Sequence, residues 1–416
     1  MSTTPATTPA TTPPRLTALS HGAGCACKLS LDELQGILAG VSWPQHDDLL
    51  VGLASGDDAA VWRQGDGRVL VATTDFFTPL VDDPRDWGRI AATNAVSDVY
   101  AMGATPRMAL NLVGWPRDLD FDVLRRVLDG AVEVAGAAGY VIAGGHSIDA
   151  VEPLFGQVVI GDADEAELLT NARAHPGQAI VLTKPIGTGV VTTALKRSAL
   201  LPAGAEGGAG GGGDRGTGAD HRGGVGAAGG GGDRGTGVDH HGGAGAAGGV
   251  DAILLVAYRA AVEEMTRLNR DAARVAKDHG ATAATDVTGF GLLGHLHRLA
   301  TASGLAASVD ADRVPLLPHV GALLDAGFVP GGSQRNAEQA ARYLAGDLPS
   351  DRTRLLLADA QTSGGLLFTV DADDTDAAVA ALTLLGHAAA RIGTTADGPP
   401  GSVEVAGDVA EPVGSR

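Results

Sequence analysis

The chain has 416 residues, 44% of them apolar, and a net charge of −19 from 30 basic and 49 acidic side chains. These values predict a globular protein of two or three domains, and they exclude a basic nucleic-acid footprint. No apolar run reaches the roughly 18 residues of a membrane span, and residues 1–14 (MSTTPATTPATTPP) lack the basic and apolar segments of a secretory signal. We expect a cytoplasmic protein with a disordered N-terminal tail.

Strand and helix patterns alternate between residues 57 and 161. Apolar, β-branched runs predict strands at 68–77, 107–114, 140–145 and 154–161, and a further strand opens after Asp57 and Asp58. Helical patterns cover 86–102 and 119–138, and Gly139 ends the second helix. This order predicts an α+β lobe with its helices on one face of a sheet.

A second lobe begins near residue 171. Strands are predicted at 179–187, 366–370 and 402–407, and helices from Gly189, over 253–276, near Leu292 and over 374–386. Residues 203–249 are mostly glycine, and GGGGDRGTG occurs at 210–218 and again at 229–237, which predicts a disordered insert. The predicted domains are therefore 1–15 (a disordered tail), 16–50 (a mobile lead-in), 51–170, 171–400 interrupted by this insert, and 401–416 (a final strand and tail).

Both cysteines of the chain lie in HGAGCACK, where Cys25 and Cys27 precede Lys28. An adjacent ammonium lowers the pKa of a thiol and favours the nucleophilic thiolate, and flanking glycines let the backbone approach a ligand closely. Half of a zinc site is a second interpretation, although no other cysteine pair exists to complete it. Two incidental thiols in a mobile segment remain the third.

Aspartates recur at the ends of the predicted elements. Asn94 and Asp98 are four residues apart, so they share one helix face together with small residues, which suggests a face that meets a ligand. Carboxylates gathered in this way suit Mg²⁺, which bridges to substrate phosphates, whereas each one alone is more often a cap or turn residue. The candidates are Asp57, Asp58, Asp75, Asp98 and Asp286.

Four glycine-rich stretches read as turns whose backbone amides would cradle phosphate: GGHS (144–147), KPIGTG (184–189), TGFGLLGH (288–295) and QTSGG (361–365). None of them is a Walker A motif or a GxGxxG fingerprint, so these motifs do not name the ligand.

Taken together, the motifs resemble selenophosphate synthetase (selenide, water dikinase). The resemblance extends from Leu16 to about Gly393 without the glycine-rich insert, through HGAGCACK, GDDAAVW, TTDFFTPLVDDPRDWGRIAATNAVSDVYAMGATP, GGHSIDAVEP, LTKPIGTGV, TDVTGFGLLGHL, PGGSQRN and DAQTSGGLL. It implies two α/β lobes of the aminoimidazole ribonucleotide synthetase-like type, an N-terminal ferredoxin-like lobe with a dimerising sheet, and a mobile glycine-rich N-terminal segment. Relatives in the wider superfamily share the aspartate-rich ATP site but lack the Cys-x-Cys-Lys lead.

The family converts ATP, selenide and water into selenophosphate, AMP and orthophosphate. The resemblance implies that Cys25 and Lys28 are catalytic, that Cys27 is a less critical second cysteine, and that Mg²⁺ is held by Asp58, Asp98 and Asp286. It also implies ATP contacts from Lys28, Ser55, Gly56, Asp57, Asp75, Asp98, Gly145, His146 and Ser147. Asn94 is a further candidate site residue because of its four-residue spacing from Asp98. The chain departs from the pattern in its insert, its tail and Ala26, where the family often has glycine.

The resemblance further implies a homodimer and a selenium-delivery protein as partners, with neither nucleic acid nor membrane. Two alternatives remain open. One is a related ATP-dependent kinase or ligase of the same superfamily, and the other is a non-catalytic protein that binds selenium or nucleotide.

Overall fold

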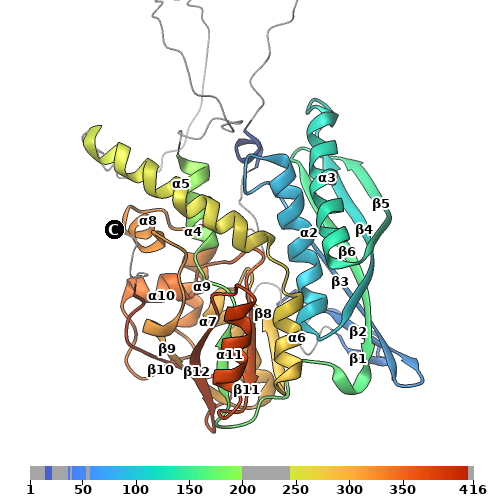
Figure 1. Ribbon diagram of the computed structural model, residues 1–416, viewed down its shortest axis with the longest axis vertical. Coiled ribbons are helices and arrows are strands. Elements are labelled where there is room, and N and C mark those ends of the chain that lie inside the picture. The colour runs from blue at the N-terminus through green and yellow to red at the C-terminus, as the bar shows by residue number, and fades with distance from the viewer. Residues whose placement is uncertain (1–14, 21–35, 38–39, 53–56, 199–243, 411–416) are drawn as a thin grey trace, which may run out of the picture.

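The computed structural model describes residues 15–20, 36–37, 40–52, 57–198 and 244–410, which form two α/β lobes (Figure 1). The described part of the N-terminal lobe has a six-stranded sheet, and that of the C-terminal lobe has a seven-stranded sheet. The predicted α+β fold class, with two lobes, is confirmed.

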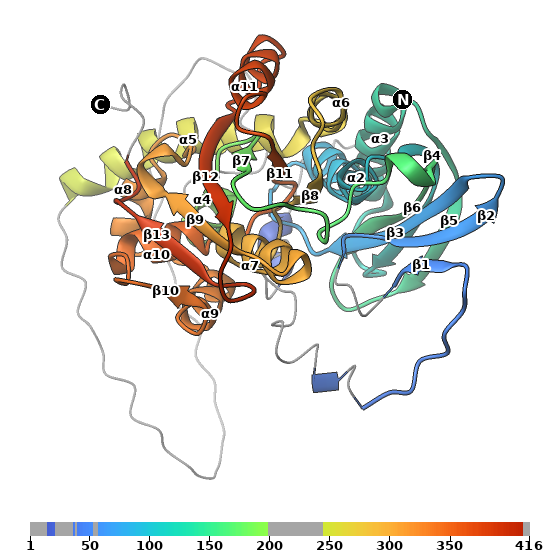
Figure 2. The same cartoon turned by 90° about the horizontal axis from the view of Figure 1, so that it is seen from below.

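The N-terminal sheet has the strand order β1-β2-β3-β6-β4-β5. Strands β4 and β5 are parallel and joined through helix α3, because a parallel pair needs a crossover connection. Helices α2 and α3 lie on one face of the sheet, as the sequence pattern predicts (Figure 2). The elements are η1 (Leu16–Leu19), β1 (Leu49–Val51), β2 (Ala60–Gly65), β3 (Arg68–Phe77), α2 (Pro84–Ala101), β4 (Thr105–Trp115), α3 (Phe121–Ala138), β5 (Val141–Asp149), β6 (Leu154–Asp164) and η3 (Glu165–Glu167).

Helix α2 connects the two lobes. It packs against β3, β6 and α3 of its own lobe, and it also contacts the C-terminal lobe through β8, α5 and α6. The helix begins at Pro84, two residues before the predicted start, because the Asp83 side chain accepts hydrogen bonds from the backbone N–H groups of Arg85 and Asp86. Proline is well tolerated at this first helical position.

Two glycines let α2 and α3 approach closely. A Cβ atom on Gly88 would lie 1.9 Å from the carbonyl oxygen of Val127, and one on Gly130 would lie 2.1 Å from the carbonyl oxygen of Arg85. No side chain fits at either position, so the crossing of these helices depends on glycine.

The C-terminal sheet is mixed, with the order β10-β13-β9-β12-β7-β11-β8. Its adjacent strands β7 and β11 are antiparallel and wholly buried. The elements are β7 (Ala179–Leu182), α4 (Thr188–Arg197), α5 (Ala244–Thr266), α6 (Arg270–Asp278), β8 (Ala283–Asp286), α7 (Gly291–Ser303), β9 (Ala306–Asp310), η4 (Ala311–Arg313), α8 (Val320–Asp325), α9 (Gly331–Ala340), β10 (Leu344–Ala345), α10 (Asp351–Leu357), β11 (Leu366–Val370), α11 (Thr375–Leu384), β12 (Ala390–Ala396) and β13 (Val403–Ala406).

Two predictions about the middle of the chain are wrong. The helix expected over 253–276 is two helices, α5 and α6, separated at Arg267–Asn269. Asn269 is held by tertiary hydrogen bonds that a continuous helix would break. Helix α5 also begins at Ala244, so the expected disordered insert does not extend to residue 249; its residues up to 243 lie outside the described part of the chain.

The GGHS stretch is also not the predicted turn, because residues 144–147 lie within β5, which continues to Asp149. A Cβ atom on Gly145 would lie 2.2 Å from the carbonyl oxygen of Asn111 in β4, so glycine here permits close strand pairing. Strand β7 is shorter than predicted and ends at Leu182.

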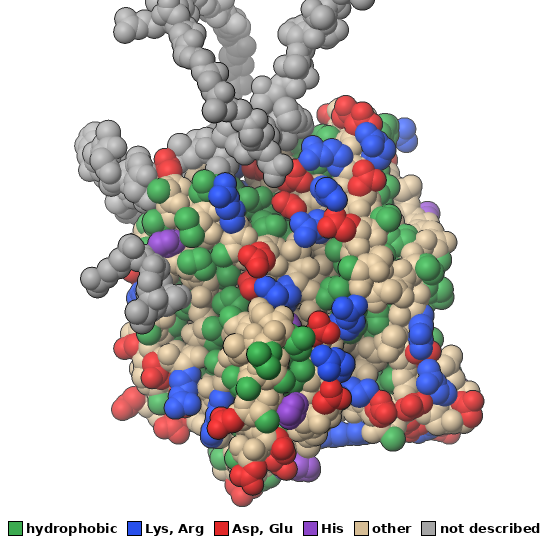
Figure 3. Space-filling model, in the orientation of Figure 1, with side chains coloured by type: hydrophobic (Ala, Val, Ile, Leu, Met, Phe, Trp, Pro, Cys, Tyr) green, Lys and Arg blue, Asp and Glu red, His purple; other side chains and the backbone are tan. Residues whose placement is uncertain are grey.

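Acidic and basic side chains are interspersed on the face of the molecule seen in Figure 3. Several of them pair, such as Arg85 with Glu133 at 2.8 Å and Arg126 with Asp83 at 2.7 Å. Among the described helices, none combines the length and the apolar character needed to cross a membrane.

Candidate functional site

Five of the predicted site residues lie outside the described residues. These are Cys25, Cys27 and Lys28 of the N-terminal segment, and Ser55 and Gly56, which precede Asp57 and Asp58 in the chain. Their roles remain predictions.

The structure brings Asp58 and Asp286 together. Asp286 ends β8, and the hydroxyl of its neighbour Thr285 donates to Asp58 Oδ1 at 2.9 Å. Burial, and then the charge of Asp286, raise the pKa of Asp58 well above its usual value. Asp58 Oδ2 is buried and accepts no hydrogen bond from any described residue. Two close carboxylates with one oxygen unsatisfied are suited to a cation.

Within the described residues, no group of three or more His, Cys, Asp or Glu side chains is arranged to hold a metal ion. The third predicted ligand, Asp98, lies on α2, where its Oδ2 accepts a hydrogen bond from the Thr73 hydroxyl. The carboxylates that influence each other's charge are therefore Asp58 and Asp286, while Asp98 is hydrogen-bonded to Thr73 of β3.

The shared helix face of Asn94 and Asp98 is confirmed, and it faces β3. Asn94 Nδ2 donates to Asp75 Oδ2 at 2.5 Å, two residues along the strand from Thr73. The predicted ATP contact Asp75 is only 8% exposed. Ser97, one helical turn after Asn94, faces the C-terminal lobe, and its hydroxyl donates to Asp286 Oδ2 at 2.6 Å. One helix thus orients carboxylates from both lobes.

The 361–365 loop is tied to α2. The Ser363 backbone N–H donates to Asn94 Oδ1 at 2.8 Å, and Asn269 Nδ2 donates to both Ser97 Oγ and the Gly364 carbonyl oxygen, each at 2.8 Å. Ser97 and Asn269 are small polar residues within helix-like sequence, and nothing in the sequence distinguishes them. Only the packing of the two lobes shows their role.

Lys184 stands out in the sequence only as part of the KPIGTG turn, yet it is 1% exposed. Its Nζ donates to the carbonyl oxygens of Arg267 at 2.7 Å and Ser363 at 3.0 Å. Burial lowers the pKa of this ammonium to about 7. Lys184 thus joins the break between α5 and α6 to the 361–365 loop.

A second buried cluster braces the start of α4. Asp359 Oδ2 accepts hydrogen bonds from the backbone N–H groups of Gly189 at 3.0 Å and Val190 at 3.3 Å, and its Oδ1 accepts one from Ser333 Oγ at 2.7 Å. Burial raises the pKa of Asp359 to about 6. Gln361 Oε1 accepts the Gly187 N–H at 3.0 Å. Protein groups therefore already occupy the amides that the KPIGTG turn was predicted to offer to phosphate.

Gly145, His146 and Ser147 lie on β5, the third strand along from β3, which carries Asp75. The cross-strand register places Asp75, Gln157, Asn111 and Gly145 in one row. Gly145 is therefore three strand spacings, about 14 Å, from Asp75. Asp57 precedes Asp58 in the chain; its Oδ1 accepts the Asn171 N–H at 2.7 Å, and its charge also raises the pKa of Asp58.

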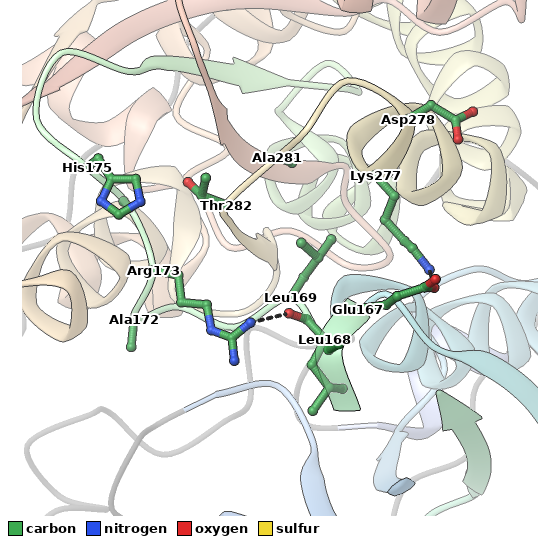
Figure 4. A pocket seen from close by; sticks show the side chains of 12 residues that line it. Glu167, Leu168, Leu169, Ala172, Arg173, His175, Lys277, Asp278, Ala281 and Thr282 are labelled. Carbon is green, nitrogen blue, oxygen red and sulfur yellow. Dashed lines mark hydrogen bonds and ion pairs between the residues drawn. The ribbon is translucent and has the colours of Figure 1, made fainter. Parts of the chain in front are cut away.

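A separate cavity of about 790 Å³ lies where the chain passes between the lobes (Figure 4). Lys277 and Glu167 form an ion pair at its edge, and Arg173 donates to the Leu168 carbonyl oxygen at 3.2 Å. None of the predicted site residues lines this cavity.

Comparison with known proteins gives this geometry its context. Family models of AIR synthase related proteins match residues 56–163 (N-terminal domain) and 225–406 (C-terminal domain). The selenide, water dikinase of Pseudomonas straminea is 42% identical over 365 residues, covering 86% of this chain and 87% of that protein. That of Rhizobium meliloti is 40% identical over 92% of this chain and 96% of its own length. The chain belongs to the selenide, water dikinase family.

Solved structures agree on the fold. Thiamine-monophosphate kinase from Stenotrophomonas maltophilia has a TM-score of 0.55 at 22% identity, over 91% of this chain and 96% of its own. The thiamine monophosphate kinase of Aquifex aeolicus has a TM-score of 0.52 at 15% identity, over 92% of this chain and 97% of its own. The resemblance drawn from the motifs, and the fold type it implies, are therefore confirmed.

Proposed function

We propose that this chain is a phosphotransferase that converts ATP, selenide and water into selenophosphate, AMP and orthophosphate. The observation that carries the proposal is the 40–42% identity to selenide, water dikinases over nearly the whole length of both chains. The buried Asp58–Asp286 pair adds a site suited to the metal–nucleotide chemistry of such an enzyme.

Mg²⁺ fits this pair on the chemistry of its donors. Mg²⁺ is commonly bound by one or two carboxylates plus substrate phosphates, so two close carboxylates are enough. Asp58 and Asp286 would hold it, with Asp98 as the third ligand that the resemblance predicts. When bound, the ion neutralises phosphate charge and orients the phosphates for transfer.

The protein's own residues fix this arrangement before substrate arrives. Ser97 orients Asp286, and Thr285 orients Asp58, through the hydrogen bonds described above. Asn94 holds Asp75 and Thr73 holds Asp98. Such preorganisation matters because phosphoryl transfer depends mainly on positioning and charge stabilisation.

The N-terminal segment would deliver selenium. Cys25 supplies a soft thiolate suited to a soft chalcogen, and Lys28 supplies a cation for the phosphates. We expect Cys25→Ser and Lys28→Ala each to abolish selenide-dependent turnover while leaving the melting temperature unchanged. Selenophosphate formation near the normal rate by either variant would exclude that role.

A homodimer formed through the N-terminal sheet is supported by its open face. Asp75 meets α2, so the alternation along β3 directs Phe76 to the opposite face, and the register places Leu110 and Ile148 there too. Phe76 is 51% exposed and Ile148 57% exposed. We expect Ile148→Glu to reduce the mass measured by light scattering from that of a dimer to that of a monomer. An unchanged mass argues against this interface.

The decisive experiment measures nucleotide products with and without selenide, under anaerobic conditions with Mg²⁺. Selenide-dependent AMP formation supports the proposal, whereas ADP as the sole product with another acceptor supports a different kinase of the superfamily. Asp58→Asn should lower turnover by about 100-fold or more, because charge stabilisation worth several kcal/mol is lost. The matched control Asp129→Asn, on the exposed surface of α3, should not.

A further inference from the structure

His295, on α7, lies beside the end of β8, the strand that carries Asp286 of the carboxylate pair. Its side chain is 3% exposed, and its ring lies between Thr285 and Thr288. Thr285 precedes Asp286 at the end of β8, and Thr288 follows in the turn before α7. The ring therefore contacts both sides of the segment that carries Asp286.

The hydrogen bonds assign the proton on the ring. The Thr288 backbone N–H donates to His295 Nε2 at 3.0 Å. A backbone N–H can only donate, so Nε2 carries a lone pair and the neutral ring must hold its proton on Nδ1. Nδ1 lies 3.4 Å from Thr285 Oγ1, so the N–H is directed at that hydroxyl.

This donation fixes the direction of the Thr285 hydroxyl. Its oxygen accepts from His295, and its single proton then has two acceptors, Asp58 Oδ1 at 2.9 Å and the Asp286 carbonyl oxygen at 3.1 Å. The carboxylate is both nearer and charged, so it takes the proton. A directed chain results, from the Thr288 amide through His295 and Thr285 to Asp58.

The end of the chain is the unsatisfied carboxylate oxygen. Asp58 Oδ1 is held by Thr285, whereas Oδ2 is buried and accepts nothing from the described residues. Rotation of the carboxylate would exchange the two oxygens, and the Thr285 hydrogen bond opposes that rotation. Groups that orient a metal-binding side chain in this way commonly affect metal affinity by about 10- to 100-fold.

We propose that His295 is a positioning residue of the cation site, which acts through Thr285 to hold Asp58 in one orientation and leave Oδ2 available for a divalent cation. This inference rests on the proposed function, since it assumes that Asp58 binds the cation.

The test is a double-mutant cycle on the full chain, with Mn²⁺ alone as the probe and free Mn²⁺ measured by electron paramagnetic resonance. Thr285→Val and His295→Leu should each weaken Mn²⁺ binding by about tenfold. The double variant should be no weaker than Thr285→Val, because His295 acts through that hydroxyl. His295→Asn, which keeps a donor near the Nδ1 position, should recover most of the affinity.

His297→Leu is the matched control. It also replaces a histidine of α7 and removes a hydrogen bond, from Nδ1 to the Gly401 carbonyl oxygen at 2.7 Å, together with a ring stacked on Tyr343. It should lower the melting temperature without changing the affinity for Mn²⁺. A purely structural role for His295 would give the same result as this control.

Two failures can be told apart. If the wild-type protein neither binds Mn²⁺ nor forms AMP, the proposed function is wrong. Suppose instead that the wild-type protein binds Mn²⁺ and that Asp58→Asn does not. The positioning role alone is then overturned if His295→Leu binds Mn²⁺ with normal affinity, or if the losses of affinity in His295→Leu and Thr285→Val multiply in the double variant.

Discussion

Lys184 offers a direct test of the buried hydrogen bonds within the C-terminal lobe. Its ammonium is enclosed and donates to the carbonyl oxygens of Arg267 and Ser363, and burial lowers its pKa from 10.5 to about 7. Lys184→Met removes the charge at similar volume. It also leaves two buried carbonyl oxygens without their donor, which costs about 1–3 kcal/mol each.

The effect of pH separates these contributions. In the unfolded chain Lys184 binds its proton up to about pH 10.5, whereas in the folded chain it loses it above about pH 7. The folded state is therefore penalised most below pH 7, and the penalty falls as the pH rises from 7 toward 10.5. Between about pH 7.5 and pH 9.5, the wild type should gain about 2–3 kcal/mol relative to Lys184→Met.

The assay is urea unfolding of the wild type and Lys184→Met at the two pH values. The quantity compared is the difference between the two proteins in free energy of unfolding, because the contributions of other titrating groups cancel in that difference. Gly136→Ala is a non-titrating control at an exposed site of α3, and its free energy of unfolding should differ from that of the wild type by the same amount at both pH values. If the difference for Lys184→Met does not change with pH, Lys184 keeps its proton in the folded protein and this reasoning fails.

Other predictions concern packing and the insert. Gly88→Ala should cost about 3 kcal/mol or more in chemical unfolding because its Cβ meets the backbone of α3, whereas Gly136→Ala, with nothing within 4 Å, should stabilise by about 0.5–1 kcal/mol. Ser333→Ala removes a 2.7 Å hydrogen bond to the buried Asp359 and should cost about 1–3 kcal/mol; an unchanged unfolding midpoint would contradict this. Deleting residues 204–243 should leave turnover within a few-fold, since loop closure depends weakly on length, and an unfolded product by circular dichroism would show a structural role.

Much of the fold follows from local sequence. The strand over 68–77 is β3 with the predicted bounds, and the strand over 366–370 is β11. Both are runs of β-branched and apolar residues, which fit the pleated surface of a buried sheet. The motifs also predict the family. The resemblance that they carry places Asp58 and Asp286 in one site, although 227 residues separate Asp58 from Thr285, the neighbour of Asp286.

The tertiary structure decided what local patterns cannot express. The break between α5 and α6 arises because Asn269 bonds to Ser97 and Gly364, residues far from it in the chain. Packing within the C-terminal lobe likewise buries Lys184 and places His295 between Thr285 and Thr288. The local sequence around neither residue predicts that burial. The spacing of apolar residues predicts which face of one helix or strand is buried. The hydrogen bonds of Asn269, Lys184 and His295 form only when segments far apart in the chain pack together. The chain therefore specifies its elements and chemistry locally, and the orientation of its carboxylates through the contact between the lobes.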